Sequence, residues 1–261
     1  MKSPFILDVS SFLSVHSIEY LVSDDLIIIK TPKLLLKIVT LEGCSSLDFR
    51  LGTFRSIRTI TLFEDLWYTK GEIVKNRLLA ILGKGEAIFA RKCSVEEIAA
   101  EQSVHFLNKN HLLGSAKNKF KYGLIYNDQI VAVATFSAPR PMKRGDKTLL
   151  SYEWVRYANL GSCRVVGGMG KLLEYFVKEV NPQEVMSYAD RDWSEGNAYL
   201  KLGFTQVGET PPIDFYVNND TFERVSLKKL RNDRKYRSFK GNLTTLRNSG
   251  NLKFLRTFSL L

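Results

Sequence analysis

Residues 164–204 decide the fold that this sequence predicts, and they read RVVGGMGKLLEYFVKEVNPQEVMSYADRDWSEGNAYLKLGF. Glycines at positions 167, 168 and 170 precede an amphipathic helix expected over Lys171–Val180. A strand is expected over Glu184–Ala189, and a short helix over Asn197–Leu202 runs into Gly203-Phe204. Backbone N–H groups at a glycine turn before a helix point towards an anion, and the helix dipole adds to the attraction. The stretch therefore predicts a loop–helix–strand unit that binds a phosphate group.

The segments on either side of this stretch alternate between strand and helix patterns. The polar turn Asn127-Asp128-Gln129 predicts a hairpin, and Ser94 with Glu97 predicts a capping box at the start of a helix. The expected helices are Glu72–Leu82 and Val95–Asn108. The expected strands are Asp25–Ile29, Leu34–Thr40, Ser56–Phe63, Ala87–Cys93, Tyr122–Tyr126, Ile130–Phe136, Leu149–Tyr157 and one or two strands within Thr205–Val217.

Composition bounds the classes of protein to which the chain can belong. The 261 residues are 44% hydrophobic and 25% charged, which is ordinary for a globular protein. No apolar run is long enough to span a bilayer and the N-terminus lacks a signal-peptide pattern, so no membrane partner is expected. Cys44, Cys93 and Cys163 lack metal-ligand spacing, so no metal site is expected, and their odd number fits a reducing cytoplasm. The net charge of +11 favours a nucleic acid or a phosphate-bearing cofactor as partner, or serves solubility alone.

The order of these elements resembles the GNAT superfamily of acyl-CoA N-acyltransferases. That family has a helix, two or three strands, a strand–loop–helix unit, a strand, a helix and a final hairpin, and its glycine loop wraps the pyrophosphate of coenzyme A. The resemblance implies an α/β (α+β) protein with a GNAT-like domain over residues 85–217, whose central sheet is mixed and mostly antiparallel. A small α/β domain over residues 1–84 would precede it, and residues 218–261 would form a basic extension.

The resemblance also implies a set of site residues. Tyr199, four residues before Gly203-Phe204, corresponds to the general acid that protonates the departing thiolate. The base is either Asp190 or Glu153, directly or through water, and the sequence leaves both open; Asp190 also fits an ordinary turn at a strand end. The strand Leu149–Tyr157 would pair with the pantetheine arm. The residues expected to hold acetyl-CoA or another acyl-CoA are Arg164, Val165, Val166, Gly167, Gly168, Gly170, Lys171 and Asn197.

The glycine motif departs from the family pattern at one position, whichever way it is aligned. The family has Gln or Arg, two residues, Gly, one residue, and then Gly or Ala. Val165 takes the place of Gln or Arg if Gly168 and Gly170 are matched, and Met169 takes the small-residue place if Arg164 and Gly167 are matched. The family's asparagine stands farther upstream of the tyrosine, where this chain has Asp192.

Several separate blocks resemble the very-short-patch-repair-like endonuclease domains of phage homing-type nucleases. Such nucleases hold a divalent metal with carboxylates and a histidine, whereas Lys37 here stands at an expected acidic position. Glu42 and Asp48 alone are a poor metal site, so we expect residues 1–84 to be a degenerate and inactive nuclease-like domain. The matching blocks are Leu62–Trp67, Ile73–Leu78, Leu82–Lys84, Ala90–Cys93, Phe106–Ser115 and Gly250–Phe254.

A weaker resemblance is to phage Mom-type DNA-modification enzymes, in which a histidine, an aspartate and a tyrosine form the site. His111, Asp190 and Tyr199 occupy comparable places in this sequence. A lone histidine such as His111 is also common as a hydrogen-bonded structural residue.

These patterns together favour acyl transfer from acyl-CoA to an amine, in the cytoplasm, which would be the host cytoplasm for a phage-encoded protein. The family context points to a nucleic-acid base or a DNA-associated protein as the acceptor. The alternative is a non-catalytic nucleic-acid-binding accessory protein derived from a homing-type endonuclease. The residues expected to contact DNA or RNA, or else to form only a solvated face, are Lys228, Lys229, Arg231, Arg234 and Lys235.

Overall fold

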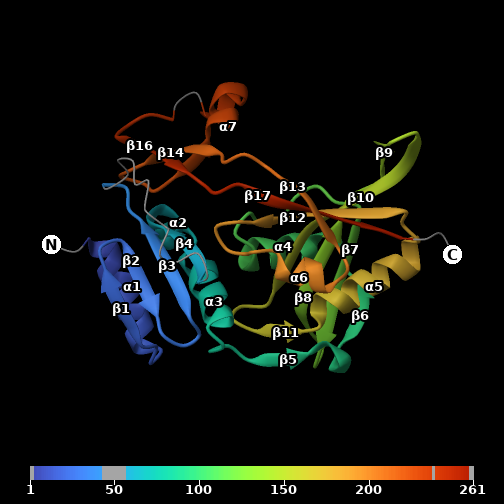
Figure 1. Ribbon diagram of the computed structural model, residues 1–261, viewed down its shortest axis with the longest axis horizontal. Coiled ribbons are helices and arrows are strands. Elements are labelled where there is room, and N and C mark those ends of the chain that lie inside the picture. The colour runs from blue at the N-terminus through green and yellow to red at the C-terminus, as the bar shows by residue number, and fades with distance from the viewer. Residues whose placement is uncertain (1–2, 43–56, 237–238, 259–261) are drawn as a thin grey trace. The chain divides into compact units, whose positions relative to one another are not determined.

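The chain forms two units, and each unit is built from segments that are far apart in the sequence (Figure 1). The computed structural model describes residues 3–42, 57–236 and 239–258, so Cys44 and Asp48 lie outside the described residues. Unit 1 consists of Met1–Gly71, Asp190–Glu195 and Thr210–Asn251. Unit 2 consists of Glu72–Ala189, Gly196–Glu209 and Leu252–Leu261. This division differs from the expected consecutive domains 1–84, 85–217 and 218–261.

Unit 1 begins with helix α1 (Pro4–Val15), which buries Phe5, Val9 and Leu13. A spacing of four residues places these side chains on one face of the helix. A four-stranded sheet follows in the order β1-β2-β3-β4, and only the pair β3–β4 is parallel. The strands are β1 (Tyr20–Ser23), β2 (Leu26–Ile29), β3 (Leu34–Val39) and β4 (Arg58–Phe63), and helix α2 (Glu64–Thr69) follows β4.

The second part of unit 1 is a three-stranded sheet in the order β15-β14-β16. Its elements are β14 (Asp214–Asn218), β15 (Arg224–Ser226), helix α7 (Leu227–Asn232), the 3-10 helix η3 (Arg234–Tyr236) and β16 (Leu243–Arg247). The buried carboxylate of Asp65 on α2 accepts hydrogen bonds of 2.6 and 2.7 Å from Arg224 on β15. This ion pair joins the segment 210–251 to helix α2 within unit 1.

Unit 2 is built on a sheet in the order β13-β17-β12-β10-β8-β7-β6, and β9 pairs with the start of β10. The strands β10 and β12 are parallel, whereas β6–β7, β7–β8, β8–β10 and β13–β17 are antiparallel. The expected mixed and mostly antiparallel central sheet is therefore confirmed. The strands of this sheet are β6 (Ser94–Glu97), β7 (Phe120–Tyr126), β8 (Gln129–Phe136), β9 (Arg140–Arg144), β10 (Lys147–Asn159), β12 (Glu184–Asp190), β13 (Thr205–Glu209) and β17 (Asn251–Thr257).

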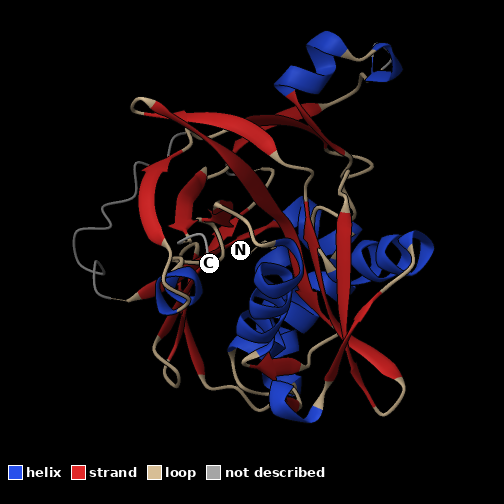
Figure 2. Ribbon diagram, turned by 90° about the vertical axis from the view of Figure 1, so that its right-hand side faces the viewer, coloured by secondary structure: helices blue, strands red, loops and turns tan. Residues whose placement is uncertain are grey.

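Helices lie against this sheet (Figure 2). A separate two-stranded parallel ladder also belongs to unit 2. Helix α5 buries Leu172, Leu173 and Phe176, and the Phe176 ring stacks on Phe136 of β8 with centroids 3.9 Å apart. No helix among the described residues is long and apolar enough to cross a membrane. The remaining elements of unit 2 are α3 (Gly71–Ile81), β5 (Ala87–Phe89), the 3-10 helix η2 (Ala90–Lys92), α4 (Ala100–Asn110), β11 (Arg164–Val166), α5 (Gly168–Val180) and α6 (Asn197–Lys201).

The structure corrects the expected helix over Val95–Asn108. Residues Ser94–Glu97 instead form β6 and pair with β7, and α4 begins only at Ala100. The side chain of Gln102, in the first turn of α4, caps the N-terminus of this helix. Its oxygen accepts a 2.9 Å hydrogen bond from the N–H of the N-cap residue Ala99. Pairing with the edge of the sheet outweighs the local capping pattern of Ser94 and Glu97.

The strands β13 and β14 form in the region Thr205–Val217, where one or two strands are expected, but they do not make the closing hairpin that the family resemblance implies. Strand β13 pairs with β17, while β14 pairs with β15 and β16. The partner of β13 thus lies more than forty residues farther along the chain, beyond the reach of a local hairpin pattern. The expected strand Ala87–Cys93 is likewise shorter, because it ends at Phe89 and turns into η2.

Candidate functional site

The centre of the candidate site is the place where the parallel strands β10 and β12 stop pairing. Their register joins Ser151–Trp154 to Glu184–Ser187, yet β10 continues to Asn159 and β12 to Asp190. On its other edge β10 stays paired with β8, through a bulge after Trp154. Beyond Trp154 and Ser187 the two strands therefore no longer bond to each other. Main-chain groups along such an opening are available to an extended ligand.

The hydroxyl of Tyr199 lies at the point where the two strands separate. It is 2.9 Å from the Ser187 hydroxyl, which also donates to the Trp154 carbonyl oxygen at 3.0 Å. The Tyr199 ring stacks on Phe254 with centroids 5.0 Å apart. Burial raises the pKa of the Tyr199 phenol, while the bond with Ser187 and the charge of Arg77 act in the opposite direction. The phenol is thus protonated at neutral pH and can act as an acid.

Glycine at position 196 makes this placement of Tyr199 possible. Gly196 precedes α6 and has φ 77°, in the left-handed region. A Cβ atom there would lie 2.1 Å from the Phe254 ring, the ring on which Tyr199 stacks. A side chain at position 196 would therefore displace the aromatic support of the phenol.

The predicted glycine loop is a tight turn into helix α5. Gly167 has φ 79° and caps the thirteen-residue helix, whose first N–H groups have no partner within the helix. Arg164–Val166, expected as part of the loop, form strand β11 and pair with β5, and the Val165 side chain is buried. The turn at Gly167–Gly170 is the part of the predicted loop that retains the geometry of an anion site.

Two other residues predicted to hold the cofactor have different surroundings. The Lys171 ammonium donates hydrogen bonds to the carbonyl oxygens of Ala90 and Cys93, so it joins α5 to η2 instead of standing open beside the turn. Asn197 is exposed in the first turn of α6, two residues before Tyr199.

The two candidate bases have different roles in the structure. Asp190 ends β12, and its Oδ1 accepts a 3.0 Å hydrogen bond from the Asp192 N–H, the geometry of a turn residue. Glu153 is paired in register with Met186, one residue before the place where β10 and β12 separate. No hydrogen bond or ion pair reaches the Glu153 carboxylate from the residues that the structure describes. We therefore prefer Glu153 to Asp190 as the base.

His111 lines a pocket of unit 2 at the C-terminal end of β10. The pocket has a volume of about 200 Å³ and is lined by Arg77, Lys109, His111 and Asn159, among others. His111 ends α4, and its Nδ1 accepts a 3.1 Å hydrogen bond from the Leu113 N–H. This contact fixes the ring by local structure, which is the structural role that a lone histidine often has.

The basic residues of the C-terminal region belong to unit 1. Lys228, Lys229 and Arg231 are exposed on α7, and Arg234 is exposed at the start of η3, which also contains Lys235. No group of three or more His, Cys, Asp or Glu side chains that could hold a metal occurs within residues 3–42, 57–236 and 239–258.

The sequence did not single out three residues that the structure brings to the site. Ser187 contacts Tyr199, and Ser151 and Lys253 line a pocket beside Glu153. Ser187 and Ser151 lie on strands that the sequence predicted, so their position on those strands could have suggested them. The place of Lys253 depends on the pairing of β17 with the sheet, which no local pattern reveals.

No protein-family model matches the chain, and no sequence match to a curated protein was found. Several solved acetyltransferases are similar to it in structure. A histone acetyltransferase-related protein from Corynebacterium glutamicum has 13% identity and a TM-score of 0.41, covering 65% of this chain and 98% of its own. The ribosomal-protein-S18-alanine N-acetyltransferase from Escherichia coli has 12% identity and a TM-score of 0.41, covering 65% and 96%. A GNAT family acetyltransferase from Elizabethkingia anophelis has 12% identity and a TM-score of 0.37, covering 64% and 99%.

Proposed function

We propose that unit 2 transfers an acyl group from an acyl-CoA to an amine. The observation that carries this proposal is the separation of β10 and β12 after Trp154 and Ser187, with the Tyr199 hydroxyl at that point. An extended pantetheine chain suits an opening lined by main-chain groups, and a diphosphate suits the glycine turn at the N-terminus of α5. Acyl-CoA is also what the sequence resemblance implies, so both lines lead to the same substrate.

The chemistry assigns one proton transfer to each of two side chains. Glu153 takes a proton from the ammonium form of the acceptor, because only a neutral amine can attack the thioester carbonyl. The C–N bond forms as the amine adds to the carbonyl, and the C–S bond breaks while the Tyr199 phenol protonates the leaving thiolate. The acylated nitrogen gives up its extra proton, which restores the phenol, so the net proton released is the one that Glu153 took from the ammonium. Burial keeps this phenol protonated until the step occurs.

The binding test places a negative charge in the glycine turn. A Cβ atom at Gly170 would meet only the Leu202 side chain, at 3.3 Å, whereas one at Gly168 would lie 2.7 Å from the Tyr157 hydroxyl. Gly170→Glu therefore adds charge with little steric disturbance, and an acidic residue in a first turn favours the helix. Gly170→Ala is the matched control, because it adds the Cβ atom alone.

We expect acetyl-CoA to bind wild type and Gly170→Ala in calorimetry, and Gly170→Glu to bind at least tenfold more weakly. Saturating wild type at a hundred times its Kd should raise the free energy of unfolding by about 2.7 kcal/mol. The absence of heat with wild type, or equal affinities for wild type and Gly170→Glu, would overturn the proposal.

A second candidate function is nucleic-acid binding by unit 1. The observation that favours it is the exposure of Lys228, Lys229, Arg231 and Arg234 on and after α7. A cluster of exposed cations attracts phosphate backbones without reading sequence.

A further inference from the structure

A pocket lies on the face of the unit 2 sheet opposite helix α5. Phe176 of α5 packs against Tyr152 of β10, and successive side chains of a strand point to opposite faces. Ser151 and Glu153 therefore point away from α5, and both line this pocket of about 200 Å³. Ser137, which directly follows β8, and residues of β9, β12 and β17 complete it, so the pocket spans neighbouring strands of one sheet.

The lining of the pocket combines charges of both signs. Glu153 supplies a carboxylate, and Arg140 of β9 and Lys253 of β17 supply two cations. The surplus of positive charge suits a ligand that carries an anionic group as well as an ammonium. Tyr188 of β12 adds a phenol, and both its burial and the charge of Glu153 raise its pKa, so it stays a hydrogen-bond donor at neutral pH.

Ser151 points independently to a ligand in this pocket. Ser151 is only 3% exposed, and its hydroxyl oxygen has no hydrogen-bond partner among the residues that the structure describes. A buried hydroxyl without a partner costs about 1–3 kcal/mol. A polar group of a bound molecule would satisfy it.

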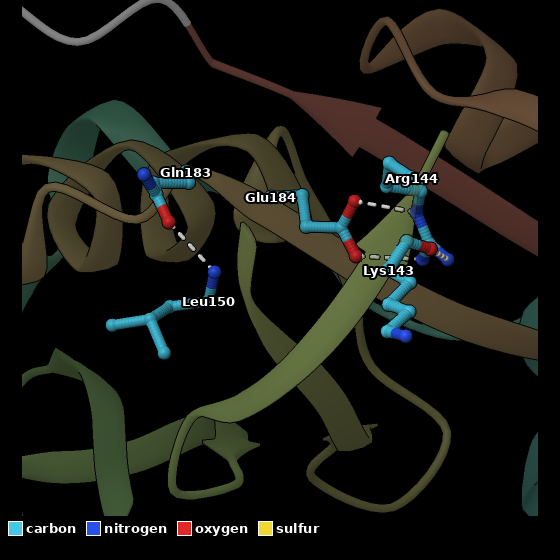
Figure 3. Close-up of polar contacts among 5 residues, drawn as sticks. All are labelled: Lys143, Arg144, Leu150, Gln183 and Glu184. Atoms are coloured by element: carbon cyan, nitrogen blue, oxygen red, sulfur yellow. Dashed lines mark hydrogen bonds and ion pairs between the residues drawn. The ribbon is translucent and has the colours of Figure 1, made fainter. Parts of the chain in front are cut away.

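An ion pair holds one wall of the pocket in place. The two carboxylate oxygens of Glu184 on β12 face the guanidinium of Arg144 on β9, with hydrogen bonds of 3.0 and 2.7 Å (Figure 3). Figure 3 also shows the Gln183 side chain accepting a 2.6 Å hydrogen bond from the Leu150 N–H on β10. Both contacts fix the β9–β10 hairpin, which presents Arg140 and Met142 to the pocket.

We infer that this pocket binds the acceptor and selects a small primary amine that also carries a carboxylate. The inference rests on the proposed acyl transfer and names the class of its second substrate. Glu153 takes the ammonium, because it stands one residue before the place where β10 and β12 separate and so next to the reacting carbonyl. Arg140 and Lys253 take the carboxylate. A volume of about 200 Å³ lies below the range of drug-sized sites, about 300–1,000 Å³, and so fits a small acceptor.

The test uses ω-amino acids of two to six carbons, each compared with the amine and the carboxylic acid of the same chain length. Binding is measured by calorimetry, with and without saturating coenzyme A. We expect at least one amino acid to bind ten or more times as tightly as its matched amine and its matched acid. Lys253→Gln and Arg140→Gln should abolish the advantage over the amine, and Glu153→Gln should abolish the advantage over the acid.

Two further variants separate a binding role from a structural one. Lys143→Gln is the control on β9, because Lys143 is exposed and lies outside the pocket lining. It should bind like wild type. Ser151→Ala removes a hydroxyl that has no partner without ligand, so it should weaken binding of the amino acid while leaving the unliganded protein at least as stable.

Equal binding of amino acid and amine, or unchanged selectivity in both Lys253→Gln and Arg140→Gln, would overturn the inference. So would binding of acetyl-CoA without binding of any amino acid, a result that leaves the proposed acyl transfer intact. Failure of acetyl-CoA to bind would instead count against the proposed function itself.

Discussion

At the scale of single residues, Tyr199 unites the chemistry of the site with the packing of unit 2. Its ring is part of the aromatic stack with Phe254, and its hydroxyl reaches Ser187 at the point where two strands separate. Tyr199→Phe keeps the ring and removes the acid. We expect kcat to fall by about 10²-fold or more, with the Kd for acetyl-CoA unchanged. A variant with wild-type kcat would exclude the phenol as the acid.

The pH dependence of kcat tests the same residue in another way. The acid must be protonated to act, and burial raises its pKa above the ordinary tyrosine value of about 10. Activity that depends on Tyr199 should therefore persist through pH 9 and decline only at higher pH. A decline centred below pH 9 that disappears in Tyr199→Phe would contradict the raised pKa.

Gly196 shows how much one missing side chain can matter. Gly196→Ala would bring a Cβ atom within 2.1 Å of the Phe254 ring at a backbone with φ 77°. We expect a loss of more than about 2 kcal/mol in the free energy of unfolding, measured in urea. Gly208→Ala is the control, because nothing lies within 4 Å of a Cβ there. Equal stability of the two variants would show that the stack on Phe254 adjusts freely.

At the scale of elements, the sequence predicts what local spacing determines. The turn at Asn127 and Asp128, both with positive φ, places the β7–β8 hairpin where the polar turn predicts it, and α5 follows its apolar spacing. The strand state of Ser94–Glu97 escaped prediction because it depends on β7, and the pairing of β13 escaped because its partner is β17. Tyr199 and Glu153 could be predicted because each lies in an element that local spacing reveals. The pocket that Glu153 shares with Lys253 could not be predicted, because it depends on the pairing of β17 with distant strands.

The ion pair between β9 and β12 makes a prediction about the hairpin that it anchors. Glu184 is fully buried, so Arg144→Met leaves a buried carboxylate without its partner. We expect a loss of about 3–5 kcal/mol in the free energy of unfolding of unit 2. The double variant Arg144→Met, Glu184→Met should recover most of it, because replacing both charges is close to neutral. A double variant as unstable as the single one would refute this account of the pair.

At the scale of the whole molecule, the division of the chain into two units separates the residues of the two proposed functions. Unit 2 contains the strand opening, Tyr199 and Glu153, while unit 1 contains Lys37 and the basic residues of α7. The nuclease-like character of residues 1–84 stays a prediction. Its consequence is that magnesium or manganese should elicit no cleavage of plasmid DNA, and cleavage that Glu42→Ala abolishes would contradict it.

The basic residues of α7 provide a test of whether the positive charge of the chain binds nucleic acid. If Lys228, Lys229 and Arg231 contact phosphates, each contact releases counterions, and log affinity for duplex DNA falls with log salt by about 0.9 per contact. Reversing all three to Glu should weaken binding and flatten the slope by roughly three units.

A control variant reverses three exposed lysines of unit 2 and so makes the same change in net charge. These residues are Lys117, Lys147 and Lys178. A mobility-shift titration at several salt concentrations compares the two variants. If both lose affinity equally, net charge alone attracts the DNA and α7 is no specific contact surface. If wild type shows no shift at low salt, the excess of basic residues serves solubility and not nucleic-acid binding.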